Sequence, residues 1–225
     1  MSRIRGTVMK DLLGEAGRDA AMRQEPLGEG ALLLRGFAAQ DTTALLRAIE
    51  HVAADAPFRH MITPGGFRMS VGMTNCGQAG WITDRRGYRY DARDPETRRP
   101  WPPMPDAFRR LAARAADAAG FAGFAPDACL INRYEPGARL TLHQDKNERD
   151  FVQPIVSASL GLPAVFLFGG LRRSDRPRRI ALASGDVVVW GGPARLVFHG
   201  VDKLAEGEHP LTGACRINLT LRKAL

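Results

Sequence analysis

The stretch Cys215-Arg-Ile-Asn-Leu-Thr-Leu-Arg222 sorts its side chains onto two chemically different faces. Side chains alternate across an extended segment, so Arg216, Asn218 and Arg222 share one face and the apolar residues between them share the other. Two arginines on one face are unusual for a closed core, because buried charges have to be paired. The pattern therefore predicts a strand that packs on its apolar side and lines a polar cavity on its other side.

Short strand candidates also fill the chain between residue 128 and this last strand. They cover residues 128–134, 155–161, 165–168, 179–182, 186–190 and 195–201, with turns rich in glycine and proline between them. Many short strands separated in this way indicate a β-sandwich or jelly roll. In the first of them Leu130, Asn132 and Tyr134 share a face and offer polar groups to the same predicted cavity.

The first half of the chain mixes strands with helices. Strands are predicted over residues 30–37 and 67–73. One helix is predicted from Asp41, as its N-cap, up to Pro57, and a second opens at Pro105-Asp106. The expected fold class is therefore mainly β with flanking helices.

Composition limits the class of protein. The chain has 225 residues, of which 44% are hydrophobic and 25% charged, as in a soluble globular protein. One domain over residues 25–225 is expected behind a flexible arm of residues 1–24. No apolar run approaches the roughly 18 residues of a membrane helix, and the basic first residues lack the apolar stretch of a secretory signal. A cytoplasmic location without membrane association is expected, and three widely spaced cysteines argue against a disulfide framework.

Positive charge favours an anionic partner. Lys and Arg number 32 against 24 Asp and Glu, a net charge of +8, and nucleic acid is the first candidate. Arginines alternate with Trp81, Tyr88, Tyr90 and Trp101 in a segment expected to be a long loop. Arginines suit phosphates and aromatic faces suit unstacked bases. Alternatively, the aromatic side chains only attach the loop to the core.

A histidine and a carboxylate stand two residues apart in Arg139-Leu-Thr-Leu-His-Gln-Asp145. In an extended segment His143 and Asp145 share a face, and they could supply two of the three ligands of a two-histidine, one-carboxylate iron site. His199 lies on another predicted strand that a sandwich can bring alongside. The other reading is a pair of polar residues in a surface loop.

The two arginines of the last strand suit a dicarboxylic acid. Guanidinium groups bind carboxylates through two parallel hydrogen bonds. Arg216 and Arg222 could hold the two ends of such a co-substrate, or one end of it and the site's own acid.

Several motifs together resemble the AlkB family of Fe(II)- and 2-oxoglutarate-dependent nucleic-acid repair dioxygenases, over about residues 25–223. The motifs are Met61-Ile-Thr-Pro-Gly-Gly66, Met69-Ser-Val-Gly-Met-Thr-Asn75, Asp127-Ala-Cys-Leu-Ile-Asn-Arg-Tyr134, Leu142-His-Gln-Asp-Lys146, Gly185-Asp-Val-Val-Val-Trp-Gly-Gly192 and Cys215-Arg-Ile-Asn-Leu-Thr-Leu-Arg222.

The resemblance implies a double-stranded β-helix, or jelly-roll, catalytic core over about residues 126–223 and a nucleotide-recognition lid over about residues 60–101. Iron would be held by His143, Asp145 and His199. The implied 2-oxoglutarate residues are Asn132, Tyr134, Arg216, Asn218 and Arg222. The predicted substrate contacts, from the resemblance and from the arginine-aromatic segment, are Trp81, Tyr88, Arg89, Tyr90, Asn147 and Arg173.

The implied activity is oxidative demethylation of bases such as 1-methyladenine and 3-methylcytosine. It would couple 2-oxoglutarate decarboxylation by O2 to methyl hydroxylation and formaldehyde release. The expected partner is alkylated single- or double-stranded DNA, with RNA as a further candidate, and the expected state is a monomer. Two alternatives stay open: a dioxygenase for a protein side chain or small metabolite, and a non-catalytic jelly-roll module that binds nucleic acid.

Two positions depart from the close bacterial pattern of the family. An acidic residue that faces the exocyclic nitrogen of the base is replaced here by Asn147, and a tyrosine is replaced by Phe67. The first change removes a negative charge, so we expect weaker discrimination in favour of cationic methylated bases over neutral ones. The second removes a hydroxyl that could contact nucleic acid.

Overall fold

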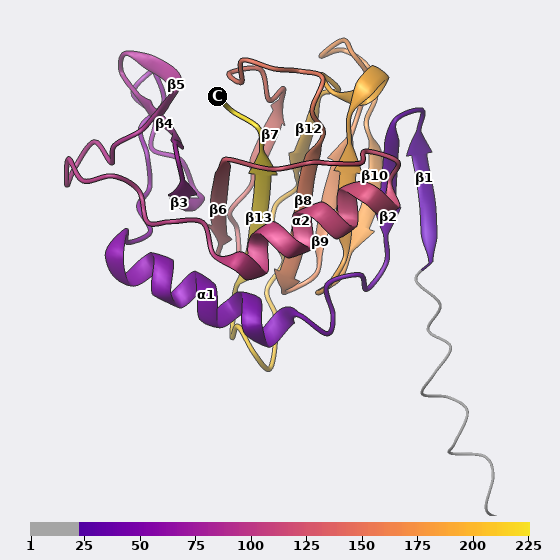
Figure 1. The fold of residues 1–225 in the computed structure, drawn as a ribbon, viewed down its shortest axis with the longest axis horizontal. Helices are drawn as coiled ribbons and strands as arrows, with labels where there is room; N and C mark the ends of the chain where they lie inside the picture. Colours follow the sequence, from indigo (N-terminus) through magenta and orange to yellow (C-terminus); the bar gives the residue numbers. More distant parts are fainter. Residues whose placement is uncertain (1–22) are drawn as a thin grey trace, which may run out of the picture.

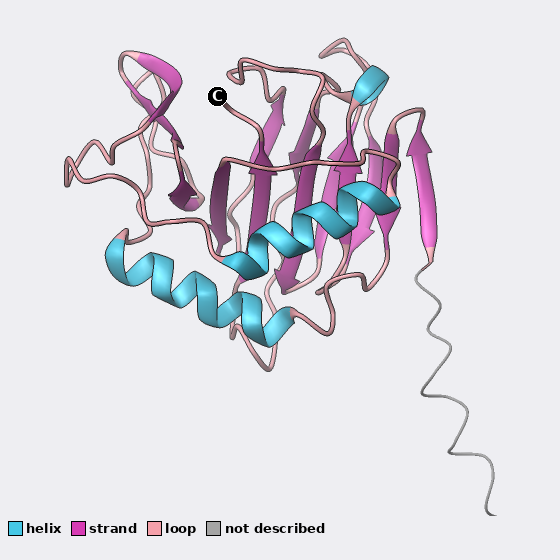
Figure 2. Cartoon of the chain, in the orientation of Figure 1, coloured by secondary structure: helices cyan, strands magenta, loops and turns pink. Residues whose placement is uncertain are grey.

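The structure, a computed structural model, describes residues 23–225. Most of the expected N-terminal arm, residues 1–22, lies outside the described residues. Two antiparallel β-sheets face each other, and two helices cover one of them (Figures 1 and 2). This is the mainly β architecture that the sequence predicts.

The larger sheet has seven strands in the order β1-β2-β11-β8-β13-β6-β3. Their bounds are β1 Gln24–Gly28, β2 Ala31–Leu34, β3 Gly72–Gly77, β6 Ala128–Tyr134, β8 Ile155–Gly161, β11 Val187–Trp190 and β13 Arg216–Arg222. β13 pairs with β6 on one side and with β8 on the other, so Asn218 lies between Asn132 and Ser159. The strand whose pattern predicted the cavity is therefore central in the sheet.

The smaller sheet has four strands in the order β10-β9-β12-β7. They are β7 Leu140–His143, β9 Ala164–Phe168, β10 Arg178–Leu182 and β12 His199–Val201. A core of apolar side chains that includes Leu130, Phe166, Phe168 and Trp190 packs between the two sheets. Towards one end of the sandwich polar side chains replace this core.

Helices α1 (Thr42–Asp55) and α2 (Asp106–Ala118) cross the outer face of the larger sheet (Figure 1). Their buried stripes, with Leu45 and Phe108, join a second apolar cluster that includes Leu219 of β13. The apolar face of β13 therefore packs under the helices, and its polar face points between the sheets, as its alternation predicts.

Asp41 is the N-cap residue of α1, as expected, although its side chain makes no capping hydrogen bond and instead accepts from Arg114 of α2 at 3.0 Å. Three local expectations were wrong. The strand predicted over residues 67–73 begins only at Gly72, because Thr63 and Phe67 close a tight turn in which Gly66 has φ +85°. A 3-10 turn over Gly192–Ala194 delays the strand predicted from residue 195 until His199.

The third concerns the segment between Trp81 and Trp101. Instead of a loop it begins with a hairpin, strands β4 (Gly80–Asp84) and β5 (Gly87–Asp91). Its turn carries Asp84 and Gly87, and Gly87 has φ +122°, which favours glycine. The hairpin stands at one end of the sandwich, beside β3 (Figure 1).

Among residues 23–225, no helix combines the length and the apolar composition that crossing a membrane requires.

Candidate functional site

A cavity of about 500 Å³ opens between the two sheets and the β4–β5 hairpin. Its walls include the polar face of β13, the end of β7, the start of β12 and the aromatic side chains of the hairpin. The predicted site residues that line it are Trp81, Tyr88, Asn132, Tyr134, His143, Asp145, Asn147, Arg173, His199, Arg216, Asn218 and Arg222. Twelve residues separated by up to 141 positions therefore meet in one place.

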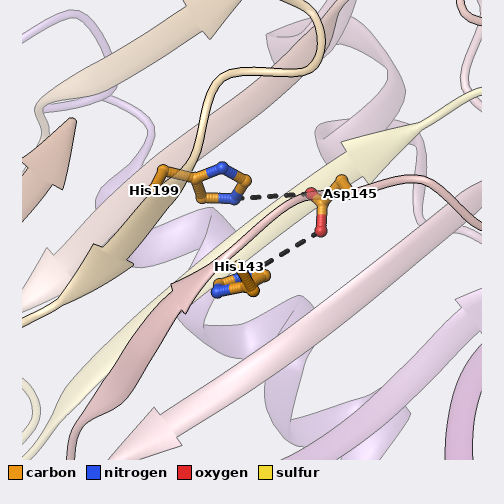
Figure 3. Close-up of side chains that lie close together, drawn as sticks. All are labelled: His143, Asp145 and His199. Carbon is orange, nitrogen blue, oxygen red and sulfur yellow. Dashed lines mark ion pairs between the residues drawn. The ribbon is translucent and has the colours of Figure 1, made fainter. Parts of the chain in front are cut away.

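His143, Asp145 and His199 form a cluster at the wall of this cavity (Figure 3). The two histidines lie opposite each other where β7 pairs with β12, and Asp145 follows β7 by two residues. One potential ligand atom from each residue lies within 4.8 Å of the others. Asp145 is 3.8 Å from Nε2 of His143 and 3.7 Å from Nε2 of His199.

Backbone carbonyls orient both imidazole rings. Nδ1 of His143 lies 2.8 Å from the carbonyl of Thr141, and Nδ1 of His199 lies 3.0 Å from that of Val197. A proton held on Nδ1 by each carbonyl leaves Nε2 free as a lone-pair donor towards the centre of the cluster. The donor set, two imidazoles and one carboxylate, is that of non-haem Fe(II) oxygenases.

The protonation states also suit a metal. Burial lowers the pKa of His199 to about 4, so its ring is neutral at physiological pH. Burial alone would raise the pKa of Asp145, but the charge and hydrogen bond of Arg222 together with the two neighbouring histidines outweigh it and hold that pKa well below its usual range. A neutral imidazole and an ionised carboxylate are the forms that bind metal.

Arg222 binds the site's own acid, one of the two roles that the sequence left open. Its Nε donates to Oδ2 of Asp145 at 2.8 Å, and its Nη2 lies 2.5 Å from the same oxygen. Both side chains are buried. Arg222 still lines the cavity, so it can also meet a ligand there.

Arg216 is the buried cation that remains uncompensated. Its Nε donates to the hydroxyl of Ser159 at 2.9 Å, and its guanidinium lies over the ring of Tyr134. Within residues 23–225 it forms no ion pair, and its Nη1 has no hydrogen-bond partner. Oδ1 of Asn132, on the neighbouring strand β6, is likewise unpartnered in the described part of the chain. A buried guanidinium with a free N–H on a cavity fits the carboxylate of a co-substrate.

Two stacked aromatic rings form another wall of the cavity. The rings of Trp81 and Tyr88 lie 5.7 Å apart at an angle of 20°. Nε1 of Trp81 donates to Oδ1 of Asn147 at 3.1 Å, which connects the hairpin to the segment after Asp145. Across the cavity, Arg173 lies over the ring of Phe198. A flat cationic ring could stack on such a wall.

Two predicted substrate contacts do not reach the cavity. Arg89 forms a two-pronged ion pair with Asp84 in its own hairpin, at 2.8 and 3.0 Å. Tyr90 turns inward and donates its hydroxyl to Glu148 at 2.7 Å. Neither residue lines the cavity, so the structure does not support a direct role for them in contacting the base.

The sequence reasoning missed four residues around the site. Ser157 and Ser159 lie on β8 opposite the polar face of β13, where they bind Asn218 and Arg216. Their alternation within a predicted strand, Ser-Ala-Ser, could have revealed them. Glu148 and Arg195 form a buried ion pair at 3.1 Å, and no sequence pattern indicates it, because 46 residues separate them.

Comparison with known proteins agrees with this geometry. Residues 30–222 match the sequence model of the 2OG-Fe(II) oxygenase superfamily. The chain is 59% identical to the alpha-ketoglutarate-dependent dioxygenase AlkB of Escherichia coli over 92% of this chain and 95% of the relative. It is 34% identical to the nucleic acid dioxygenase ALKBH1 of Mus musculus over 60% of this chain and 34% of the mouse protein. The solved structure of OsALKBH1 superposes with a TM-score of 0.79 at 29% identity, over 89% of this chain and all of that one.

Proposed function

Because this chain belongs to the 2OG-Fe(II) oxygenase superfamily, we propose that it repairs nucleic acid by oxidative demethylation of N-alkylated bases. One observation carries the proposal: the His-Asp-His cluster, the uncompensated Arg216 and the Trp81–Tyr88 wall open into the same cavity. The first suits iron, the second a carboxylate of 2-oxoglutarate, and the third a planar base. The names of the similar dioxygenases, AlkB and the nucleic acid dioxygenase ALKBH1, support the same substrate class.

Each group of residues has a distinct task. His143, Asp145 and His199 would hold Fe(II), which with 2-oxoglutarate and O2 supplies the oxidation of an N-methyl group, released as formaldehyde. Arg216 would bind one carboxylate of 2-oxoglutarate through its free Nη1, with Asn132, Tyr134 and Asn218 completing that part of the cavity. Arg222 lowers the pKa of Asp145 and binds its Oδ2, so it would hold the carboxylate ionised and in place as a metal ligand.

The aromatic wall would hold the base. The target atom lies inside a base pair in duplex DNA, so the nucleotide has to be flipped out, at a cost of a few kcal/mol that is smaller for a damaged base. Stacking of an extruded base on Trp81 and Tyr88 returns about 1–3 kcal/mol. Arg173 would face its backbone from across the cavity.

We further propose that residues 60–101 act as a nucleotide-recognition lid over a catalytic core of residues 126–223. The hairpin within the first range carries both stacked rings, and the second range carries the metal cluster. Alkylated DNA, single- or double-stranded, is the proposed partner, with RNA as a second candidate. A monomer in the cytoplasm is the proposed form.

A formaldehyde-release assay tests the proposal. The purified chain with Fe(II) and 2-oxoglutarate should release formaldehyde from DNA and RNA oligonucleotides that carry 1-methyladenine or 3-methylcytosine, and release none when 2-oxoglutarate is omitted. Turnover of 2-oxoglutarate without formaldehyde from any oligonucleotide would favour a protein or metabolite substrate instead. Tight oligonucleotide binding without any turnover would favour the non-catalytic module.

Asn147 is expected to set the preference between cationic and neutral bases. Its amide has an acceptor but no charge, and a carboxylate near a cationic ring at the edge of the cavity would add about 1 kcal/mol of attraction. Asn147→Asp should therefore raise the ratio of activity on 3-methylcytosine to activity on 1-methylguanine about fivefold. Parallel rates on the two oligonucleotides measure the ratio, and an unchanged ratio would contradict the idea.

A further inference from the structure

Tyr90, which does not reach the cavity, lies at a buried junction between the hairpin and the metal cluster. Its hydroxyl donates to Oε1 of Glu148 at 2.7 Å and accepts from Nη1 of Arg222 at 3.3 Å. Arg222 in turn binds the carboxylate of Asp145. One tyrosine hydroxyl thus joins strand β5 to the arginine that holds the predicted metal ligand.

Glu148 fixes the other side of the junction. Its side chain is only 1% exposed and lies 3.1 Å from Nη2 of Arg195 and 3.5 Å from Nε of Arg222. Arg195 also donates to the backbone carbonyl of Asp145 at 2.8 Å. Two carboxylates and two guanidinium groups therefore compensate one another at this junction. Oε2 of Glu148 has the ion pair with Arg195 but no hydrogen-bond partner among residues 23–225.

The hydroxyl of Tyr90 stays protonated in these surroundings. Burial raises the pKa of Tyr90 well above its usual range, and the neighbouring carboxylates act in the same direction. A protonated hydroxyl can donate to Glu148 and accept from Arg222 at the same time. Removing it would leave both charged groups short of a hydrogen-bond partner, which is costly for buried groups.

The pairing of strands β4 and β5 connects the Tyr90 contact to the stacked rings of Trp81 and Tyr88. Tyr90 lies directly opposite Trp81, and Tyr88 precedes it by two residues on the same face. Thr83, on that face too, binds the carbonyl of Ile62 and so anchors β4 to a different segment. The hydroxyl of Tyr90 ties β5 to Glu148 and Arg222, whereas the other contact of β5 with this segment, from Nδ2 of Asn147 to the carbonyl of Tyr88 at 3.5 Å, is exposed.

We propose that Tyr90 and Glu148 are positioning residues that set the distance between the stacked rings and the metal cluster, and so place the methylated base for oxidation. The proposal rests on the proposed function for its substrate, but the anchor itself is a property of the chain. It also explains why Tyr90, on the same face of the hairpin as Trp81 and Tyr88, binds Glu148 and Arg222 and is not among the residues that line the cavity. A purely space-filling role would need the ring of Tyr90 and not its hydroxyl.

Tyr90→Phe distinguishes a positioning role of the hydroxyl from a space-filling role of the ring, because phenylalanine keeps the ring and lacks the hydroxyl. The variant should lower kcat/KM for a 3-methylcytosine oligonucleotide about ten- to a hundredfold, which corresponds to the usual free energy of a hydrogen bond to a charged group. KM for 2-oxoglutarate should change less than about threefold. The ratio of succinate formed to formaldehyde formed equals one when every turnover oxidises the methyl group. In Tyr90→Phe this ratio should rise above one. An unchanged kcat/KM and ratio would overturn the proposal.

Amide hydrogen exchange gives a readout without turnover. In the protein with Mn(II) and 2-oxoglutarate but no oligonucleotide, the amides of residues 86–91 should exchange faster in Tyr90→Phe than in the wild type. Thr83→Val is the matched control: it removes another inward hydroxyl of the hairpin, whose partner is the carbonyl of Ile62 on a different segment, so exchange over residues 86–91 should stay as in the wild type. Exchange over residues 86–91 that matches the wild type in Tyr90→Phe would overturn the anchor, even if no oligonucleotide proved to be a substrate.

Glu148→Gln tests the partner. Glutamine keeps the volume and an acceptor for Tyr90 but removes the charge that attracts Arg195 and Arg222. If the two residues act through each other, the effect of Tyr90→Phe on kcat/KM should shrink at least threefold in the Glu148→Gln background. If the effects of the two substitutions on kcat/KM are additive, Tyr90 and Glu148 do not act through each other.

Discussion

His199→Ala should abolish formaldehyde release, with a loss of at least a thousandfold. The substitution removes one of three ligand atoms that lie within 4.8 Å of one another, whereas loss of an outer partner of a metal ligand typically costs only about 10- to 100-fold. Affinity for Fe(II) should fall in parallel, as measured by titration with Co(II) or Mn(II) under anaerobic conditions. His51→Ala is the matched control, because His51 is exposed on α1, and it should keep wild-type activity.

The same variant separates catalysis from binding. The aromatic wall is left intact in His199→Ala, so the affinity for a methylated oligonucleotide should change by less than about threefold. The ring of His199 also packs against Trp190, so a thermal melt must first show that the variant is folded. Full activity in a folded His199→Ala variant would contradict the metal assignment.

Arg216→Ala should also have a large effect: it should raise KM for 2-oxoglutarate about a hundredfold. The side chain is a buried guanidinium without an ion pair in the described residues, and removing one partner of a buried charge pair costs about 2–5 kcal/mol. Initial rates against 2-oxoglutarate concentration measure KM. Binding to the Mn(II)-loaded protein, followed by tryptophan fluorescence, gives the affinity without turnover.

Two comparisons sharpen this result. Arg216→Lys keeps the charge but not the fork of donors, so it should show an intermediate rise in KM of about tenfold. A 2-oxo acid that lacks the distal carboxylate should be rejected by the wild type and distinguished far less by Arg216→Ala. A KM for 2-oxoglutarate that stays at the wild-type value would show that the acid binds elsewhere.

The sequence predicted most of the site because strand alternation is a local property. The polar face of β13 and the spacing of His143 and Asp145 follow from side-chain directions within one extended segment. His199 was found differently, by elimination, since only three of the five histidines fall in the strand-rich half of the chain. The family resemblance supplied most of the remaining predicted residues, and the sandwich brings twelve of them to one cavity.

The partners of those residues could not be predicted, because they depend on contacts between distant segments. Alternation places Tyr88 and Tyr90 on one face of the hairpin but does not say that one meets the cavity and the other Glu148. Likewise, it offers Arg216 and Arg222 equally to a ligand. The structure distinguishes them, since Arg222 pairs with Asp145 while Arg216 has no ion pair within residues 23–225.

The stacked pair Trp81 and Tyr88 has a consequence for selectivity. The two rings stack on each other, and Nε1 of the indole donates to Oδ1 of Asn147. The binding wall is thus preorganised, so little side-chain entropy is lost when a base arrives. The remaining cost falls on the nucleic acid, which must unstack and expose its base. Discrimination can then begin with how readily a base leaves its helix, before any contact with the metal: weakly paired, damaged bases reach the wall more often than intact ones.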